Sequence, residues 1–416
     1  MPTRRAALRL LDAVLRRGQA LEAALDAAAR DLKQVNDRAL AHAIAAEVLR
    51  RLPDLDALID SATARPLPDD AKARFALRIA LVQALALGTP PHAAIATALP
   101  LVEGGPRKLV HGVFGTLMRR SAALPEVPAL PAPVVARWRA AWGEEMVEAA
   151  ARAIASPPPL DLTLKDAEAT GTLLGRVGGI SLFPGNIRLA EHGPVPQVAG
   201  YAEGAWWVQD LAASLPARLI GAGSGSAIDV CAAPGGKTMQ LASAGWRVTA
   251  IDIAENRLGR LSDNLARTGL AAEVIATDAL AWQPSTRADA VLLDAPCSAT
   301  GIFRRHPDVL HRASPALIED AGALQARLLD RIASWVKPTG VLVYAVCSLE
   351  PAEGEAQIER FLAEHGEFSL EPIRADELPG GIAADPRGWL RTLPGVLGAE
   401  GGCDGFFVAR LRRSLI

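Results

Sequence analysis

Residues 291–301 read VLLDAPCSATG. Three apolar residues lead into Asp294, and then Pro296, Cys297 and Ser298 precede small residues and a glycine. A short apolar run bounded by such residues predicts a buried strand. Its end would place the carboxylate of Asp294 and the thiol of Cys297 at the mouth of a sheet. From these residues alone, we expect Cys297 to act as a nucleophile and Asp294 to assist it.

Strands and helices alternate around this stretch, from about residue 205 onward. Short apolar strands separated by helices predict a mostly parallel sheet that is covered on both faces, as in Rossmann-like α/β domains. The expected strands are residues 227–231, 247–252, 273–278, 289–294, 340–347 and 405–412. The expected helices are residues 237–244, 254–268, 318–336 and 353–365.

The chain before this domain divides into two further parts. Residues 1–124 show helical spacing of apolar residues and predict an all-α bundle, with Asn36 or Asp37 capping one helix. Residues 124–133 read LPEVPALPAP, which is typical of a stiff linker. A helix over 134–155 and short strands near 160–164 and 178–183 would form a small α+β connector. The expected domains are residues 1–124, 125–200 and 201–416.

Charge and cysteine usage narrow the class of protein. The net charge is −2, but residues 1–124 carry 18 Lys+Arg against 12 Asp+Glu. This balance is compatible with nucleic-acid binding and equally with ordinary variation. Four scattered cysteines without a CxxC pair indicate neither a disulfide framework nor a metal site. Without a long apolar run or a cleavable leader pattern, we expect a cytoplasmic protein that does not span a membrane.

A glycine turn lies between the first expected strand of the sheet and its helix, in DVCAAPGGKT at residues 229–238. Gly235 and Gly236 allow a close approach of the backbone to a ligand, and the helix start offers free N–H groups. The turn is neither GxGxxG nor a P-loop, so a pyrophosphate is not its natural ligand.

Acidic residues end the next three expected strands. Asp252 is placed to accept hydrogen bonds from the hydroxyl groups of a ribose, and Asp278 is placed to meet an adenine ring. Asp294 ends the last of these strands. Each could instead cap the following helix. As a set they favour an adenosine site, and S-adenosylmethionine is the ligand that brings adenosine and positive charge without a pyrophosphate.

Two Cys-Ser pairs, at Cys297 and Cys347, end two expected neighbouring strands. A single strand-end cysteine is usually a packed residue, but two beside a cofactor edge favour chemistry. Methyl transfer to carbon 5 of a pyrimidine needs a thiolate that adds at carbon 6 and an acid near the ring nitrogen. Two thiols and Asp294 would satisfy that need, and the residues alone do not rank the thiols.

Residues 301–312 read GIFRRHPDVLHR and follow the Cys297 loop. Their basic side chains would contact the phosphates of a nucleic acid, although a solvated basic loop is the alternative. A target base would have to leave its stack to reach the thiol. The candidate RNA-binding residues are Arg304, Arg305, His306 and Arg312.

Three stretches, DVCAAPGGKT, LLDAPCSATGIFRRHPDV and YAVCSLEPAEGEAQI, resemble the RNA cytosine-5 methyltransferases, and most closely the bacterial small-subunit ribosomal RNA methyltransferase B family. NDRALAHAIAAEVLRRLPDLDALI and KLVHGVFGTLMRR resemble the antiterminator NusB, whose fold is expected for the helical part. The resemblance implies 5-methylcytosine formation in 16S ribosomal RNA by a cytoplasmic enzyme, which we expect to be a monomer.

The resemblance also assigns roles to residues. The family's nucleophile falls on Cys347, while Cys297 would assist product release and Asp294 would act at the reacting ring. Val346 stands where the family usually has threonine, Lys165 where an asparagine is usual, and His111 where an asparagine is common. The residues implied to line the S-adenosylmethionine site are Cys231, Ala232, Ala233, Pro234, Gly235, Gly236, Lys237, Asp252, Asp278 and Asp294.

Three other functions fit parts of the sequence. The same chemistry could act on transfer RNA or another RNA. A non-catalytic RNA-binding or assembly factor could keep the fold, but both thiols, the glycine turn and the strand-end acids argue against it. A dinucleotide-dependent dehydrogenase would share the alternating pattern, but the absence of GxGxxG in the sequence weighs against it.

Overall fold

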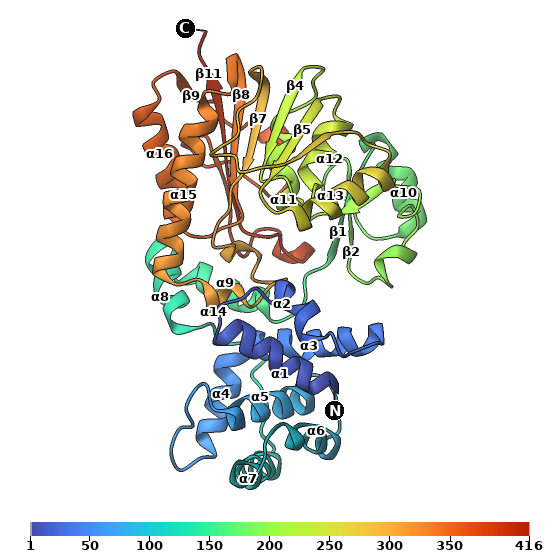
Figure 1. Cartoon of the computed structure of the whole chain (residues 1–416), viewed down its shortest axis with the longest axis vertical. Coiled ribbons are helices and arrows are strands. Elements are labelled where there is room, and N and C mark those ends of the chain that lie inside the picture. The colour runs from blue at the N-terminus through green and yellow to red at the C-terminus, as the bar shows by residue number, and fades with distance from the viewer. Residues whose placement is uncertain (1, 416) are drawn as a thin grey trace. The chain divides into compact units, whose positions relative to one another are not determined.

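The computed structural model describes residues 2–415. The chain forms two compact units, shown in Figure 1. The helical unit contains residues up to 157 together with 303–314, and the sheet unit contains residues 158–302 and those from 315 onward. The structure therefore groups residues 125–157 with the helices and residues 158–200 with the large sheet, and the three-part division at 124 and 200 remains a prediction.

The helical unit is all-α in its described residues, as predicted. Its core includes the fully buried side chains of Leu10, Ile44 and Ile79 from three different helices. The helices are α1 (Pro2–Leu15), α2 (Leu21–Ala28), α3 (Val35–Arg50), α4 (Leu52–Ser61), α5 (Lys72–Leu85), α6 (Pro91–Ala98), η1 (Leu99–Leu101), α7 (Gly105–Arg119), α8 (Ala132–Trp142), α9 (Glu144–Ile154) and α14 (Val309–Arg312).

Two details of this unit differ from the prediction. Helix α3 begins at Val35, so Asp37 lies inside the helix, and its carboxylate accepts a hydrogen bond from Thr3 Oγ1 of α1 at 3.1 Å. The single helix predicted over 134–155 is two helices, because Gly143 has φ +83° and ends α8. A positive φ is a conformation that glycine adopts readily and that no α-helix contains.

A small antiparallel sheet in the order β2-β1-β3 opens the sheet unit. It consists of β1 (Leu160–Leu164), β2 (Asn186–Leu189) and β3 (Trp206–Val208), with α10 (Thr170–Val177) beside it. The predicted strand at 160–164 is confirmed. The strand predicted at 178–183 is wrong: Gly178 and Gly179 have φ +74° and +87°, and only Ile180 forms an isolated bridge, to Arg188.

The large sheet has the order β10-β11-β8-β7-β4-β5-β6, with β9 paired to β11. Strands β6, β5, β4, β7 and β8 run parallel, and β11 runs antiparallel to β8. The strands are β4 (Ser226–Val230), β5 (Arg247–Asp252), β6 (Glu273–Ala276), β7 (Ala288–Asp294), β8 (Val336–Val346), β9 (Phe368–Leu370), β10 (Leu390–Thr392) and β11 (Phe406–Arg413). The mostly parallel sheet is confirmed.

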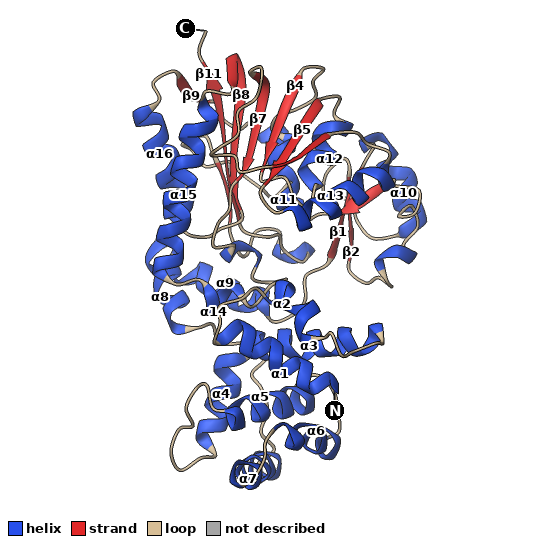
Figure 2. Cartoon of the chain, in the orientation of Figure 1, coloured by secondary structure: helices blue, strands red, loops and turns tan. Residues whose placement is uncertain are grey.

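Helices cover both faces of the large sheet, as Figure 2 shows. Alternate residues of β7 point to opposite faces, which is the period of two of a strand. Val291 and Leu293 pack with α15 and α16, whereas Ala290 and Leu292 pack with α11 and α12. These helices and their neighbour are α11 (Leu211–Arg218), α12 (Gly236–Ser243), α13 (Glu255–Thr268), α15 (Pro315–Ala333) and α16 (Glu355–Glu364).

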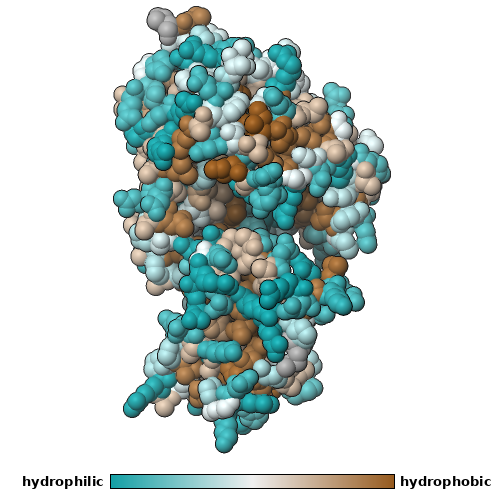
Figure 3. Space-filling view, viewed as in Figure 1, coloured by the Kyte–Doolittle hydropathy of each residue, from teal (hydrophilic) through white to brown (hydrophobic). Residues whose placement is uncertain are grey.

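The surface of the molecule is mixed in character. On the face shown in Figure 3, polar residues dominate the helical unit, and apolar groups appear between polar ones on the sheet unit. No helix within residues 2–415 combines the length and the apolar character that crossing a membrane requires.

A buried ion pair fixes the small sheet to the helices of the large one. Asp161 of β1 accepts two hydrogen bonds of 2.7 Å from Arg188, its register partner on β2. The same carboxylate accepts the backbone N–H of Leu211, at the start of α11, at 3.0 Å. Both side chains of the pair are at most 2% exposed. Removing one charge leaves the other without its counter-charge in the interior.

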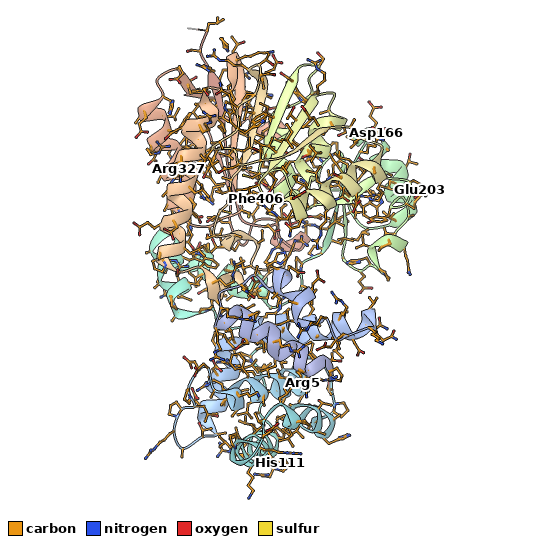
Figure 4. All side chains as sticks on the ribbon, viewed as in Figure 1. Arg5, His111, Asp166, Glu203, Arg327 and Phe406 are labelled. Atoms are coloured by element: carbon orange, nitrogen blue, oxygen red, sulfur yellow. The ribbon has the colours of Figure 1, made fainter. Side chains whose placement is uncertain are left out.

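We therefore expect Asp161→Ala to lower the free energy of unfolding by about 3–5 kcal/mol, because Arg188 would stay buried and unpaired. Urea denaturation followed by tryptophan fluorescence measures this change. The matched control is Glu203→Ala, since Glu203 lies at the margin of the unit in Figure 4 and faces Arg176 at 3.5 Å with both side chains exposed. That pair should contribute less than about 1 kcal/mol. Equal effects of the two substitutions would contradict the anchoring role of Asp161.

Candidate active site

The predicted strand-end residues meet at one edge of the large sheet. Because β4 to β8 run parallel through this part of the sheet, their carboxyl ends share that edge. In spatial order, the edge carries one polar group or thiol after each strand: Cys347 after β8, Asp294 at the end of β7, Cys231 after β4, Asp252 at the end of β5 and Asp278 after β6. The two thiol-bearing loops are neighbours because β7 pairs with β8.

In the turn between β4 and α12, the backbone of two glycines packs closely against neighbouring side chains. Gly235 has φ +104°, and a Cβ there would lie 2.8 Å from a side-chain atom of Leu261. Gly236 begins α12, and a Cβ on it would lie 3.3 Å from Gln209. Cys231 also has a positive φ, of 62°. The turn therefore needs glycine in order to pack against Leu261 and Gln209, and it leads into a helix start, which suits an anionic or polar ligand.

A carboxyl group lies beneath this turn. Asp229 of β4 is fully buried, and burial raises its pKa to about 7. Its Oδ2 accepts a hydrogen bond from Thr238 Oγ1 at 2.6 Å, while Oδ1 has no partner within residues 2–415. This interaction holds the first turn of α12 to the end of β4.

The acids of β5 and β6 already accept hydrogen bonds within the protein. Asp252 accepts the backbone N–H groups of Ala233 at 3.2 Å and Ala254 at 2.8 Å, and it pairs with Arg257 at 2.8 Å. Asp278 accepts the N–H of Leu280 at 2.9 Å. Both acids therefore stabilise the turns that follow their strands, which was the alternative to a ligand role. For Asp252 the bond to Ala233 also ties β5 to the glycine turn.

Lys237 connects the glycine turn to the thiol-bearing strands. Its ammonium group lies 2.7 Å from Asp294 Oδ2 and 5.4 Å from the centroid of the Phe406 ring. Phe406 starts β11, in the interior of the sheet unit in Figure 4. Burial disfavours the charged form of Lys237, but its negatively charged neighbours, Asp294 foremost, outweigh burial and raise the pKa of the lysine. The sequence indicated Lys237 as a cofactor residue and did not indicate this ion pair.

The two predicted thiols lie in contact with each other. Cys297 Sγ and Cys347 Sγ are 3.5 Å apart. The hydrogen bond to Cys347, together with burial, raises the pKa of Cys297 well above its usual value. Burial likewise raises the pKa of Cys231 to about 12, with a further contribution from Asp252. Cys403 is buried in an apolar cluster with Ala212.

A buried carboxylate behind the thiols was missed by the sequence analysis. Glu353 ends a short 3₁₀ turn, η5 (Pro351–Glu353), and is fully buried. It accepts hydrogen bonds from Ser298 and Ser348, the residues that follow the two cysteines. The available signal was an acid close after the second Cys-Ser pair, in CSLEPAE.

The predicted RNA-binding residues belong to the helical unit. Arg304 is 3% exposed, and its backbone oxygen accepts hydrogen bonds from the Arg50 guanidinium. Arg312 donates to Gly18 O at 2.9 Å and pairs with Asp308. Burial lowers the pKa of His306 below its usual value. This segment packs with the helices α1 to α3, and its contact with RNA remains a prediction.

Within residues 2–415, no cluster of His, Cys, Asp or Glu side chains is arranged to hold a metal ion.

Alkylation can rank the thiols in the folded protein. Near neutral pH, we expect iodoacetamide to modify Cys347 before Cys297 and Cys231, because raised pKa values keep the latter two protonated and a thiolate is the reactive form. Cys231 should gain reactivity only as the pH approaches its pKa of about 12. Peptide mass spectrometry measures each site, with the denatured protein as the reference. Faster alkylation of Cys297 than of Cys347 would contradict this ranking.

Comparisons with known proteins agree with this geometry. A model of the NusB family matches residues 1–116, and a model of the 16S rRNA methyltransferase RsmB/F family matches residues 222–412. The ribosomal RNA small subunit methyltransferase B of Xylella fastidiosa is 37% identical, with 98% of this chain and 97% of that protein aligned. The corresponding protein of Klebsiella pneumoniae is 34% identical, with 97% and 96% aligned.

A solved structure shares the fold over nearly the whole chain. The crystal structure of PH0851 superposes with a TM-score of 0.76 and 22% identity, covering 99% of this chain and 98% of that one. Since relatives above 30% identity align over almost their full length, the chain belongs to the 16S rRNA methyltransferase RsmB/F family and carries a NusB-family domain at its N-terminus.

Proposed function

We propose that the protein uses S-adenosylmethionine to form 5-methylcytosine in 16S ribosomal RNA, through a covalent adduct between Cys347 and carbon 6 of the cytosine. The observation that carries this proposal is the contact of two thiols, 3.5 Å apart, on the strand ends that also present Asp294. Methylation at a pyrimidine carbon requires a thiolate and an acid, and this edge offers both, with a second thiol beside the first. Membership of the family supports the RNA substrate.

Cys347 would start the reaction as a thiolate. A sulfur electron pair forms the bond to carbon 6 while the electrons of the carbon 5–carbon 6 double bond move onto carbon 5 and are shared with the ring nitrogen N3, which makes carbon 5 nucleophilic. After carbon 5 has gained the methyl group, its proton passes to a base, which can be a water molecule. The electrons of that C–H bond restore the double bond, and the sulfur leaves as a thiolate. The enzyme therefore ends the cycle with its thiols unchanged.

Cys297 would take the second role. Its raised pKa keeps it protonated beside Cys347, so it can donate a hydrogen bond to the thiolate and stabilise it before attack and after release. The resemblance to the family assigns the same roles to the two thiols. Val346 in place of the usual threonine lies in the interior of the sheet, at the end of β8, and keeps a β-branched strand residue there.

Asp294 and Lys237 would act on the ring as a charged pair. Negative charge builds up on the pyrimidine after the thiolate adds, and a proton held near the ring nitrogen stabilises it. Asp294 is the predicted group for that position, with a side chain 31% exposed at the edge, and while it is paired with Lys237 the proton available to the ring is one on the lysine ammonium group. Lys237 keeps the local charge balanced because its ammonium group lies 2.7 Å away.

The residues of the glycine turn fit the cofactor. Residues 231–237, Asp252 and Asp278 would hold S-adenosylmethionine, which supplies an electrophilic methyl group when bound. Glycine at positions 235 and 236 lets the turn pack against Leu261 and Gln209 beside the start of α12, and carboxylates suit ribose hydroxyls and a sulfonium charge. To accept a ribose, Asp252 would exchange its ion pair with Arg257, whose side chain is 54% exposed, for the ribose hydroxyls.

The proposal includes contact with RNA by the basic segment, and its positive charge supports that contact. The residues concerned are Arg304, Arg305, His306 and Arg312. Hydrogen bonds of Arg312 and the burial of Arg304 hold these residues within the helical unit, so they would also shape that surface. His111, a departure from the family pattern, is exposed near the middle of α7 and is labelled on that helix in Figure 4. Its position makes it a second candidate contact.

Substitution of each thiol tests the proposed roles. Cys347→Ala should lower methyl transfer to 16S RNA by at least about 10³-fold, because the covalent step is lost. Cys297→Ala should form the adduct but release it slowly, so a protein–RNA band should persist in denaturing gels. Cys403→Ala is the control for loss of a thiol that takes no part in the proposed reaction: Cys403 is buried in the apolar cluster against which Cys347 packs, and this variant should keep most of its activity.

The opposite pattern, with the persistent adduct in Cys347→Ala, would reverse the two roles. Methylation of transfer RNA but not of 16S RNA by the unaltered protein would replace the proposed substrate while leaving the chemistry.

A further inference from the structure

We propose that Glu353 is a positioning residue that ties the two thiol-bearing loops together and so sets the distance between Cys297 and Cys347. This inference rests on the proposed function, because that function gives both thiols a part in one reaction. The contact itself is independent of any RNA or cofactor and can be tested without them.

The Glu353 carboxylate joins two segments that are far apart in the sequence. Its Oε1 accepts the backbone N–H of Ser298 at 2.8 Å, and its Oε2 accepts hydrogen bonds from the hydroxyl groups of Ser298 and Ser348. Gln325 Nε2 of α15 adds a bond to Oε1 at 3.2 Å. Each serine follows one of the thiols directly, so one side chain fixes both loops a single residue away from the sulfur atoms.

Neighbouring bonds hold the same junction. Ser348 Oγ accepts the backbone N–H of Glu350 at 3.1 Å, and Thr300 Oγ1 accepts that of Leu349 at 3.0 Å. Gly301 N donates to Cys347 O at 3.0 Å. These contacts support the two loops, and Thr300 Oγ1 also lies 3.5 Å from Ser298 Oγ and 3.3 Å from Ser348 Oγ, but Glu353 accepts the shorter hydrogen bonds from both serines.

Glu353 is itself held in place by the strand that carries Cys347. Tyr344 of β8 donates a hydrogen bond from its hydroxyl group to the backbone oxygen of Glu353 at 2.6 Å, and Glu353 N donates to Glu350 O at 3.0 Å. Burial of a carboxylate is costly unless donors satisfy it. The four donors named above are uncharged and bind both carboxylate oxygens. A carboxylate can accept all four hydrogen bonds at once.

The carboxylate also acts on the thiols by its charge. Its negative charge contributes to the raised pKa of Cys297, after the hydrogen bond to Cys347 and burial. Glu353 would therefore help to keep Cys297 protonated while Cys347 reacts. An uncharged replacement would weaken the contact between the loops and would also reduce the rise in the pKa of Cys297.

Disulfide formation measures the thiol contact directly. Diamide oxidises two adjacent thiols: the sulfurs form one S–S bond, and diamide takes up two electrons and two protons to become the hydrazine. The unaltered protein should form the Cys297–Cys347 disulfide readily, since the sulfur atoms are 3.5 Å apart. In Glu353→Gln an N–H₂ group replaces one carboxylate oxygen and cannot accept hydrogen bonds from the surrounding donors. The two loops then lose part of their shared contact, and we expect the disulfide to form at least about tenfold more slowly.

Glu359→Gln is the matched control, because Glu359 lies on α16 with a side chain that is 60% exposed. It should oxidise like the unaltered protein. For methyl transfer, Glu353→Gln should lower kcat and leave the KM values for RNA and S-adenosylmethionine unchanged, because the thiols and not the binding surfaces are displaced.

An oxidation rate in folded Glu353→Gln equal to that of the unaltered protein would overturn the proposal. If that variant does not fold, Ser298→Ala and Ser348→Ala each remove one hydroxyl donor, and oxidation of both at the unaltered rate would overturn it as well. Slow oxidation in Glu353→Gln, in a protein whose unaltered form methylates no RNA, would support the positioning role and refute the proposed function.

Discussion

The parallel pairing of β6, β5, β4, β7 and β8 is the constraint on which the candidate site depends. Parallel strands end at one edge, so residues spread over more than a hundred positions in the chain come together there. The register sets the detail: Asp294 pairs with Ala345, and the loops that carry Cys297 and Cys347 therefore leave the sheet side by side.

Strand order also divides the edge into two parts. The glycine turn, Asp252 and Asp278 belong to β4, β5 and β6, whereas both thiols belong to β7 and β8. Lys237 connects the two parts. It lies in the first turn of α12, directly after the glycine turn, and its side chain forms an ion pair with Asp294 of β7. In the proposed function, this boundary is where the methyl group would meet the base. In that function, the ion pair between Lys237 and Asp294 would join the cofactor part of the edge to the thiol part.

The sequence predicts the strand ends well because they combine apolar runs with polar residues at a fixed place. It fails where conformation depends on one glycine: Gly143 divides the predicted helix over 134–155, and Gly178 prevents a strand at 178–183. It also misses Glu353, because nothing in a local pattern shows which distant donors will surround an acid. The basic segment of residues 301–312 follows a thiol in sequence, yet most of it packs into the helical unit, which adjacency along the chain does not reveal.

Methylation at carbon 5 is the central claim, and it has a direct isotopic signature. Substrate 16S RNA labelled with tritium at carbon 5 of cytosine can be incubated with the protein and S-adenosylmethionine, and tritium in water can be counted against methyl groups gained. Because carbon 5 must lose its hydrogen when it gains the methyl group, the account predicts one tritium released for each methyl transferred. Methyl transfer without tritium release would place the methyl group on another atom and contradict the account.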